Sequence, residues 1–138
     1  MQPRWLFRIL TSVALCTVAT SNGYTHHSYA AEFNSNNPQT IEGIVREVWF
    51  KNPHVRYYVT VTDDDGRETV WDARGLSPVK LVRKGWTKST IQVGDRVTLH
   101  GHVGHTNKTI MSILDITLQD GTVLSSRSVT YDITKQDD

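Results

Sequence analysis

Cysteine is almost absent from the chain. Cys16 is the only one among 138 residues, and it lies inside an apolar run near the N-terminus. Leu15 precedes it, and a small residue would be expected there if Cys16 carried a lipid. Without that N-terminal segment the chain has no disulfide and no thiolate, which excludes cysteine zinc sites and cysteine nucleophiles.

Long apolar runs are also missing. The longest, Ile9 to Ala19, is interrupted by Thr and Ser and preceded by Arg4 and Arg8. It is too short for a membrane-spanning helix, and the pattern is typical of a secretory signal. We therefore predict a signal peptide over residues 1–23, with a membrane anchor as the alternative.

The signal prediction leaves three cleavage positions open, after Ala19, Ser21 or Gly23, because each leaves small residues at the recognition positions. Export would place the mature protein in the periplasm or outside the cell. We expect no membrane attachment once the signal is removed.

An excess of one charge sign is lacking too. Removing residues 1–23 lowers Lys plus Arg from 15 to 13 against 14 acidic residues, so the formal net charge changes from +1 to −1. Nucleic-acid binding needs a strong basic excess, so no nucleic-acid partner is expected. The remaining length, about 115 residues, is enough for one domain with one core.

No catalytic motif is present in the sequence. There is no phosphate loop, dinucleotide fingerprint or nucleophile motif, and no spacing pairs two carboxylates. Asp72 and Asp115 interrupt apolar stretches, where a hydrogen-bonded structural carboxylate is the better interpretation. The sequence thus favours a protein that binds something over an enzyme.

The chain after the signal divides into three parts by composition. Residues 24–38 are polar and Asn-rich, and are predicted to be an N-terminal arm that ends at the breaker Asn36-Asn37-Pro38. Residues 39–120 hold the apolar patterning and form the predicted domain. Residues 121–138 are predicted to be a polar tail, with a short strand near 128–133 as an alternative.

Alternating apolar residues predict five strands. In the second, Val55 to Thr62, alternate side chains face inward. In the first, Thr40 to Phe50, the apolar parity changes after Gly43, which indicates a bulge or a bend. The others are predicted at Glu68–Ala73, Arg96–Val103 and Thr109–Leu118, the fourth with Arg96, Thr98, His100 and His102 outward.

One short helix is predicted between the third and fourth strands. Ser77 would be its N-cap, Pro78 its first residue and Gly85 its C-cap. A bent first strand and a helix between strands three and four are typical of the OB-fold. We predict an all-β chain with one short helix, folded as a five-stranded OB-fold-like Greek-key barrel. An open sheet or a small β-sandwich is the alternative.

The first candidate site is the pair His26 and His27. If cleavage follows Gly23, the new amino terminus, two amides and the third-position imidazole of His26 offer four nitrogens in a plane. That geometry suits copper or nickel as the divalent ion. The alternative is an arm with two solvated histidines.

The remaining histidines are the other candidate metal ligands. His54 follows Pro53 at a turn and could be a ligand, a proton carrier or a structural turn residue. His100 and His102 share one face of a strand, and His105 follows in the next loop, so they form a weaker candidate for zinc or copper. The alternative for them is a polar strand face that binds nothing.

Several stretches together resemble a known family. They are His26-His27-Ser28-Tyr29-Ala30-Ala31-Glu32-Phe33, Gly43-Ile44-Val45, Trp49, Asn52-Pro53-His54-Val55, Ser77-Pro78, Arg83-Lys84-Gly85-Trp86-Thr87-Lys88 and Gly94-Asp95. The family comprises small exported bacterial proteins and is known only as a domain of unknown function, number six-one-five-two. The resemblance implies export and a small β-rich domain, and it implies no activity. His26, His27 and His54 match its motifs, whereas His100, His102 and His105 do not clearly do so.

Two functions are consistent with these observations. The first is an exported binding protein that takes a transition metal, with copper expected and nickel or zinc as alternatives, through His26, His27 and His54. The second is an accessory module that uses exposed aromatic side chains to bind another exported or periplasmic protein, with no metal. The oligomeric state is left open.

Overall fold

The structure, a computed structural model, describes residues 29–127. The chain divides into two units at Ala30 and Ala31, and the strands and the helix named here all belong to the second unit. Along this unit the elements are β1 (Phe33–Trp49), β2 (Arg56–Thr62), β3 (Glu68–Arg74), α3 (Pro78–Arg83), β4 (Arg96–Gly104), β5 (Ile110–Leu118) and β6 (Val123–Ser125). Within the described residues, no helix has the length and apolar character needed to cross a membrane.

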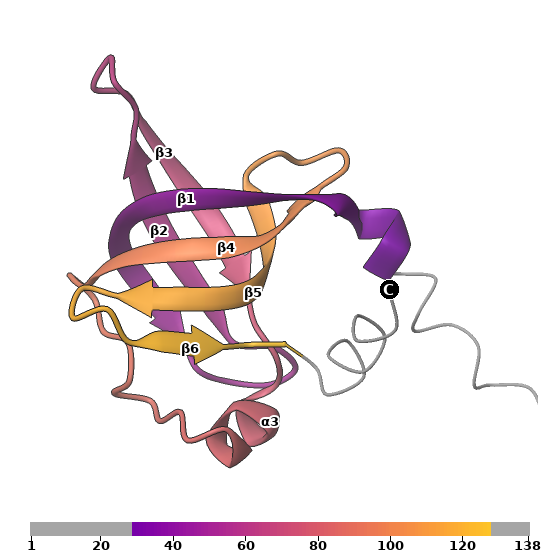
Figure 1. Ribbon diagram of the computed structural model, residues 1–138, viewed down its shortest axis with the longest axis vertical. Coiled ribbons are helices and arrows are strands. Elements are labelled where there is room, and N and C mark those ends of the chain that lie inside the picture. The colour runs from indigo at the N-terminus through magenta and orange to yellow at the C-terminus, as the bar shows by residue number, and fades with distance from the viewer. Residues whose placement is uncertain (1–28, 128–138) are drawn as a thin grey trace, which may run out of the picture. The chain divides into compact units, whose positions relative to one another are not determined.

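Five of the strands close into a ring (Figure 1). β1 pairs antiparallel with both β2 and β4, β2 pairs with β3, and β4 pairs with β5. The ring closes where β3 and β5 run parallel over a short stretch that begins at Asp72 and Ile110. This arrangement, with the helix between β3 and β4, confirms the predicted all-β, OB-fold-like architecture.

The closure depends on β1, which changes partner near its middle. Its first part pairs with β4 as far as Ile44, and its last part pairs with β2 from Ile44 onward. A Cβ atom at Gly43 would lie 2.4 Å from the carbonyl oxygen of Thr60, so only glycine allows β2 this close. A register shift between Val45 and Glu47 explains the change of apolar parity in the sequence.

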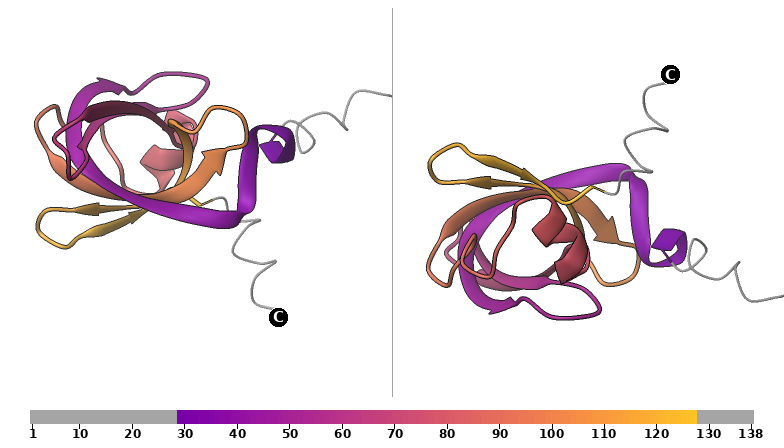
Figure 2. Two further views of the ribbon diagram at one scale, coloured as in Figure 1. Left: turned by 90° about the horizontal axis from the view of Figure 1, so that it is seen from above. Right: turned by 90° about the horizontal axis from the view of Figure 1, so that it is seen from below.

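The core lies inside the ring (Figure 2). The predicted inward residues of β2 pack there, and Tyr57 is only 1% exposed. Leu81 of α3 and Trp86, which is 2% exposed, close one end of the core. Trp86 therefore packs the helix against the core. Ser77 does occupy the N-cap position, but its side chain makes no capping hydrogen bond.

β1 is longer than predicted. It begins at Phe33, so the Asn-rich end of the predicted arm belongs to the strand. Between Phe33, opposite Gly104, and Pro38, opposite His102, the register of β1 shifts against β4. Proline is tolerated in strands at such irregularities, which is why Asn36-Asn37-Pro38 does not end the pairing.

The C-terminal part is more ordered than the predicted polar tail. β6 pairs with β5, and the Ser126 backbone N–H donates to the carbonyl oxygen of Leu114 at 2.7 Å. Ser126 Oγ also accepts a hydrogen bond from the Leu76 N–H at 3.2 Å. The strand considered near residues 128–133 lies outside the described residues.

Candidate functional site

His54 lies exposed in the connection between β1 and β2. Its Nδ1 lies 3.2 Å from the carbonyl oxygen of Gly75, just after β3. A carbonyl oxygen can only accept a hydrogen bond, so Nδ1 carries the proton and donates. The neutral ring then has its lone pair on Nε2. Histidines that bind metals commonly have this arrangement, because the carbonyl fixes both the tautomer and the ring orientation.

The connection that carries His54 is tied to the segment after β3. The Val55 N–H donates to the Leu76 carbonyl oxygen at 3.1 Å, and the Gly75 N–H donates to the Val55 carbonyl oxygen at 2.9 Å. The Asn52–Pro53 peptide bond is cis. The two backbone hydrogen bonds hold the segment that carries His54 against the residues that follow β3.

The other histidines are placed differently from one another. His26 and His27 lie outside the described residues. His100 Nδ1 lies 3.1 Å from Thr40 Oγ1 on β1. His105 is exposed, and its backbone N–H donates to the Glu32 carbonyl oxygen at 2.9 Å.

His102 was predicted to lie on an outward, polar strand face, but it is buried, with only 2% of it exposed. β4 lies between β1 and β5, and His102 sits opposite Pro38 on one strand and Ser112 on the other. Among residues 29–127, no three His, Cys, Asp or Glu side chains form a group that could hold a metal ion. His100, His102 and His105 are thus not gathered into a site within that range.

The two carboxylates singled out in the sequence are engaged with arginines. Asp72 Oδ2 accepts from Arg74 Nε at 2.9 Å and lies 3.4 Å from Arg56 Nη1. Asp115 pairs with Arg127 through both carboxylate oxygens. Burial acts to lower the pKa of Arg74, but its bonds to Asp72 and Glu32 outweigh this and raise it. Both aspartates therefore have the structural role that the sequence predicted.

An aromatic face lies on the ring's outer side, at the end of β1 and on β2. Trp49 and Tyr58 meet edge to face, with ring centroids 5.8 Å apart and an interplanar angle of 74°. Lys51 Nζ lies 4.1 Å from the centroid of the Trp49 ring, within cation–π range. The Trp49 indole N–H donates to Glu47. Trp49 is exposed and Tyr58 is half-buried, and an aromatic pair of this kind with an adjacent cation is the surface that the protein-interaction hypothesis needs.

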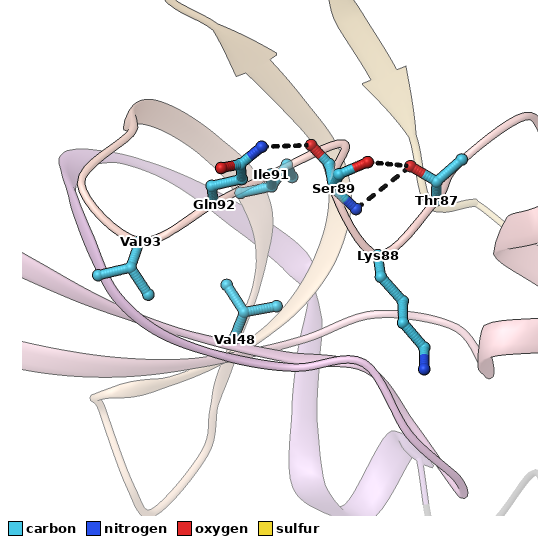
Figure 3. A pocket seen from close by; sticks show the side chains of 7 residues that line it. All are labelled: Val48, Thr87, Lys88, Ser89, Ile91, Gln92 and Val93. Carbon is cyan, nitrogen blue, oxygen red and sulfur yellow. Dashed lines mark hydrogen bonds between the residues drawn. The ribbon is translucent and has the colours of Figure 1, made fainter.

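A shallow hollow of about 530 Å³ lies beside the loop between α3 and β4 (Figure 3). Its polar groups bond to one another. Gln92 Nε2 donates to the Ser89 carbonyl oxygen at 3.2 Å, and the Thr87 and Ser89 hydroxyls lie 3.0 Å apart. These groups are thus partly committed to holding the loop.

Another hollow, of about 380 Å³, lies between the early part of β1, β3 and the loop after β4. We call it the mouth hollow. It is lined by Asn34, Asn37, Gln39, Ile41, Trp71, Val103, Gly104 and Lys108. None of these was predicted as a site residue. The one available signal was the density of Asn before the first strand.

A family model for a family of unknown function, DUF6152, matches residues 13–111. The chain belongs to this family. The matched range includes all of the candidate histidines, and it includes β1 to β4 with the start of β5. Membership of DUF6152 assigns no activity to these residues. No curated protein matches the chain.

Proposed function

We propose that this DUF6152 protein is an exported, non-enzymatic protein that binds a transition metal, with His54 as one ligand. The observation that carries the proposal is the Nδ1 contact of His54 with the Gly75 carbonyl oxygen. It directs the lone pair to Nε2 on an exposed ring. His54 is therefore oriented as a ligand while Nε2 is left for the metal.

The further ligands proposed are His26 and His27 of the N-terminal arm. Imidazole nitrogens, with or without a free amino terminus, suit copper best among the common divalent ions, followed by nickel and zinc. Copper is thus the favoured metal. Localisation to the periplasm or the cell exterior is part of the same proposal, and it rests on the signal-like N-terminal segment.

The test is a copper titration of the secreted protein after its N-terminus has been sequenced, followed by calorimetry and electron paramagnetic resonance. We expect saturable binding that weakens at least tenfold in His54→Ala and in the double variant H26A/H27A. His105→Ala is the matched control, because His105 is exposed and its backbone N–H, which the variant keeps, makes its bond to Glu32. Unchanged affinity in the triple variant lacking His26, His27 and His54 would refute the proposal.

The second candidate is an accessory module that binds another exported protein through the aromatic face. It is favoured by Trp49, Tyr58 and Lys51, which form a cluster on the outer side of the sheet. Aromatic and cationic side chains of this kind are common in binding hot spots. This function needs no metal, so absence of metal binding in the titration would leave it as the better proposal.

A further inference from the structure

The mouth hollow has an apolar floor and a polar rim. Ile41, Trp71 and Val103 supply the floor, and each of them packs against or within the core. The rim carries three side-chain amides and one ammonium group, from Asn34, Asn37, Gln39 and Lys108. Ligand sites in proteins commonly have this size and this mixture of an aromatic or apolar lining with a few polar groups.

One wall of the hollow is made by the irregular part of β1. Asn34 and Asn37 lie between the paired residues Phe33 and Pro38, where the register against β4 shifts. Asn34 Oδ1 accepts a hydrogen bond from the Asn36 N–H at 3.1 Å, which turns the backbone locally. Bulges often aim side chains toward a site, and this one brings two amides to the hollow.

The opposite wall is the loop between β4 and β5, which is fixed at both ends. The Thr109 carbonyl oxygen accepts from the Asp72 N–H at 2.9 Å, and the His105 N–H donates to Glu32. Within the loop, Asn107 Oδ1 accepts from the Thr109 N–H at 3.0 Å and from its hydroxyl at 2.9 Å. Lys108 is thus presented from a braced loop, and the hollow is largely formed before any ligand arrives.

The chemistry of the lining narrows the class of ligand. Each side-chain amide offers both a donor and an acceptor, which matches neighbouring hydroxyl groups. The indole of Trp71 offers an apolar surface for the C–H face of a ring. Among the described residues, no carboxylate lines the hollow and Lys108 is its one charged side chain, so an anionic group is favoured.

We propose that the mouth hollow binds a saccharide that carries a carboxylate, with a sugar ring over Trp71, its hydroxyls on the amides and its carboxylate at Lys108. OB-fold-like proteins use this loop region for oligosaccharides or oligonucleotides, so the fold is compatible with the ligand. The mouth hollow shares no residue with the proposed metal site, so each of the two proposals can be correct without the other.

The test is a calorimetric and NMR titration of the full chain with trigalacturonic acid and with the neutral trisaccharide maltotriose. We expect saturable binding of the acidic sugar at least fivefold tighter than the neutral one. Lys108→Ala should remove that preference, and Gln39→Ala and Asn37→Ala should each weaken binding at least threefold. Lys88→Ala, in the shallow hollow beside α3, is the matched control and should change nothing.

Trp71→Phe should weaken the binding of both sugars, and circular dichroism would confirm that the variant is folded. If Trp71→Phe does not fold, the variants at the exposed residues Gln39 and Asn37 still decide the test. No saturable binding of either sugar would overturn the proposal, as would affinities unchanged in the Gln39 and Asn37 variants. Equal affinity for the two sugars would overturn the role of Lys108, and tighter binding of a mononucleotide would overturn the ligand class.

Discussion

At the scale of single residues, Tyr57 combines full burial with a polar group. Its side chain lies in the core, and its hydroxyl has no hydrogen-bond partner among residues 29–127. Burial raises the pKa of Tyr57 above its ordinary value. The folded protein therefore holds this proton at a pH where an unfolded chain, with a tyrosine pKa of about 10, has released it.

This difference predicts how stability depends on pH. The contribution of Tyr57 to the free energy of unfolding is fully present below about pH 10, and it falls by roughly 1.4 kcal/mol per pH unit above that value. Tyr57→Phe should remove this part of the slope, and because the hydroxyl is buried and unpaired, it should raise stability at pH 7 by about 1 kcal/mol. Urea unfolding from pH 8 to 11 measures both effects. Tyr58→Phe, on the outer face, is the control and should keep the slope.

Gly43 is a second residue with a large expected effect on stability, because its lack of a side chain lets β1 and β2 approach closely. A Cβ atom there would meet the Thr60 carbonyl oxygen at 2.4 Å and Val59 Cγ1 at 2.7 Å. Backbone atoms cannot move aside cheaply, so Gly43→Ala should lower the unfolding free energy by about 2 kcal/mol or more. Thermal unfolding measures it, with Ser35→Ala, exposed on the same strand, as the control. A loss no greater than in the control would show that β1 and β2 can separate without cost.

At the scale of elements, β5 has two successive neighbours on one side. β3 pairs with its start, from Ile110 to Ser112, and β6 pairs with its later part, from Asp115 to Thr117. β6 therefore covers a stretch of strand edge that the closing of the ring leaves open. Uncovered edges invite pairing with other chains.

Removal of β6 together with the residues C-terminal to it should expose that edge. A chain ending at Asp120 would lose the Asp115–Arg127 pair and the Ser126 contacts with Leu76 and Leu114. We expect a lower melting temperature and self-association, measured by calorimetry and light scattering. Asp115→Asn, which weakens the ion pair and keeps β6, should destabilise the chain without making it associate. A truncated chain that stayed monomeric would contradict this role for β6.

The same elements show how far the sequence could lead. Strict alternation located β2, and the parity change around Gly43 correctly indicated an irregular, bent β1. β1 was predicted too short because asparagine and proline disfavour regular strands, whereas a bulge accommodates both. β6 has three residues and a partly exposed face, too little for a periodic signal.

The candidate sites were harder to predict for a different reason. Alternation gives the side of a strand on which a side chain lies, as for His102, but not whether another part of the chain covers that side. The mouth hollow joins Asn34 to Lys108, which are distant in sequence and meet only because the ring closes. His54 could be singled out as a candidate because its turn is local in the sequence, whereas its contact with the distant Gly75 carbonyl oxygen could not be predicted.

At the scale of the whole molecule, the ring separates the candidate sites. His54 lies in the connection after β1, which follows the strand's β2-paired part. The mouth hollow takes its polar wall from the opposite, β4-paired part of β1 and from the loop after β4. That loop lies at the other end of the ring from α3 (Figure 1). The two ends of β1 thus lead to two surfaces with different chemistry. Substitutions in the mouth hollow need not disturb the connection that carries His54, and the reverse also holds.

The double pairing of β1 also has a consequence for how the chain folds. β1, β2 and β3 are consecutive and joined by short connections, so they can associate as soon as they are made. The pairing of β1 with β4 joins residues about fifty or more positions apart, and such contacts form slowly. Until β4 arrives, one side of β1's early part has no neighbour. The Asn-rich bulge with Pro38 makes this unpaired edge of β1 irregular and polar, so it is a poor template for pairing with another chain.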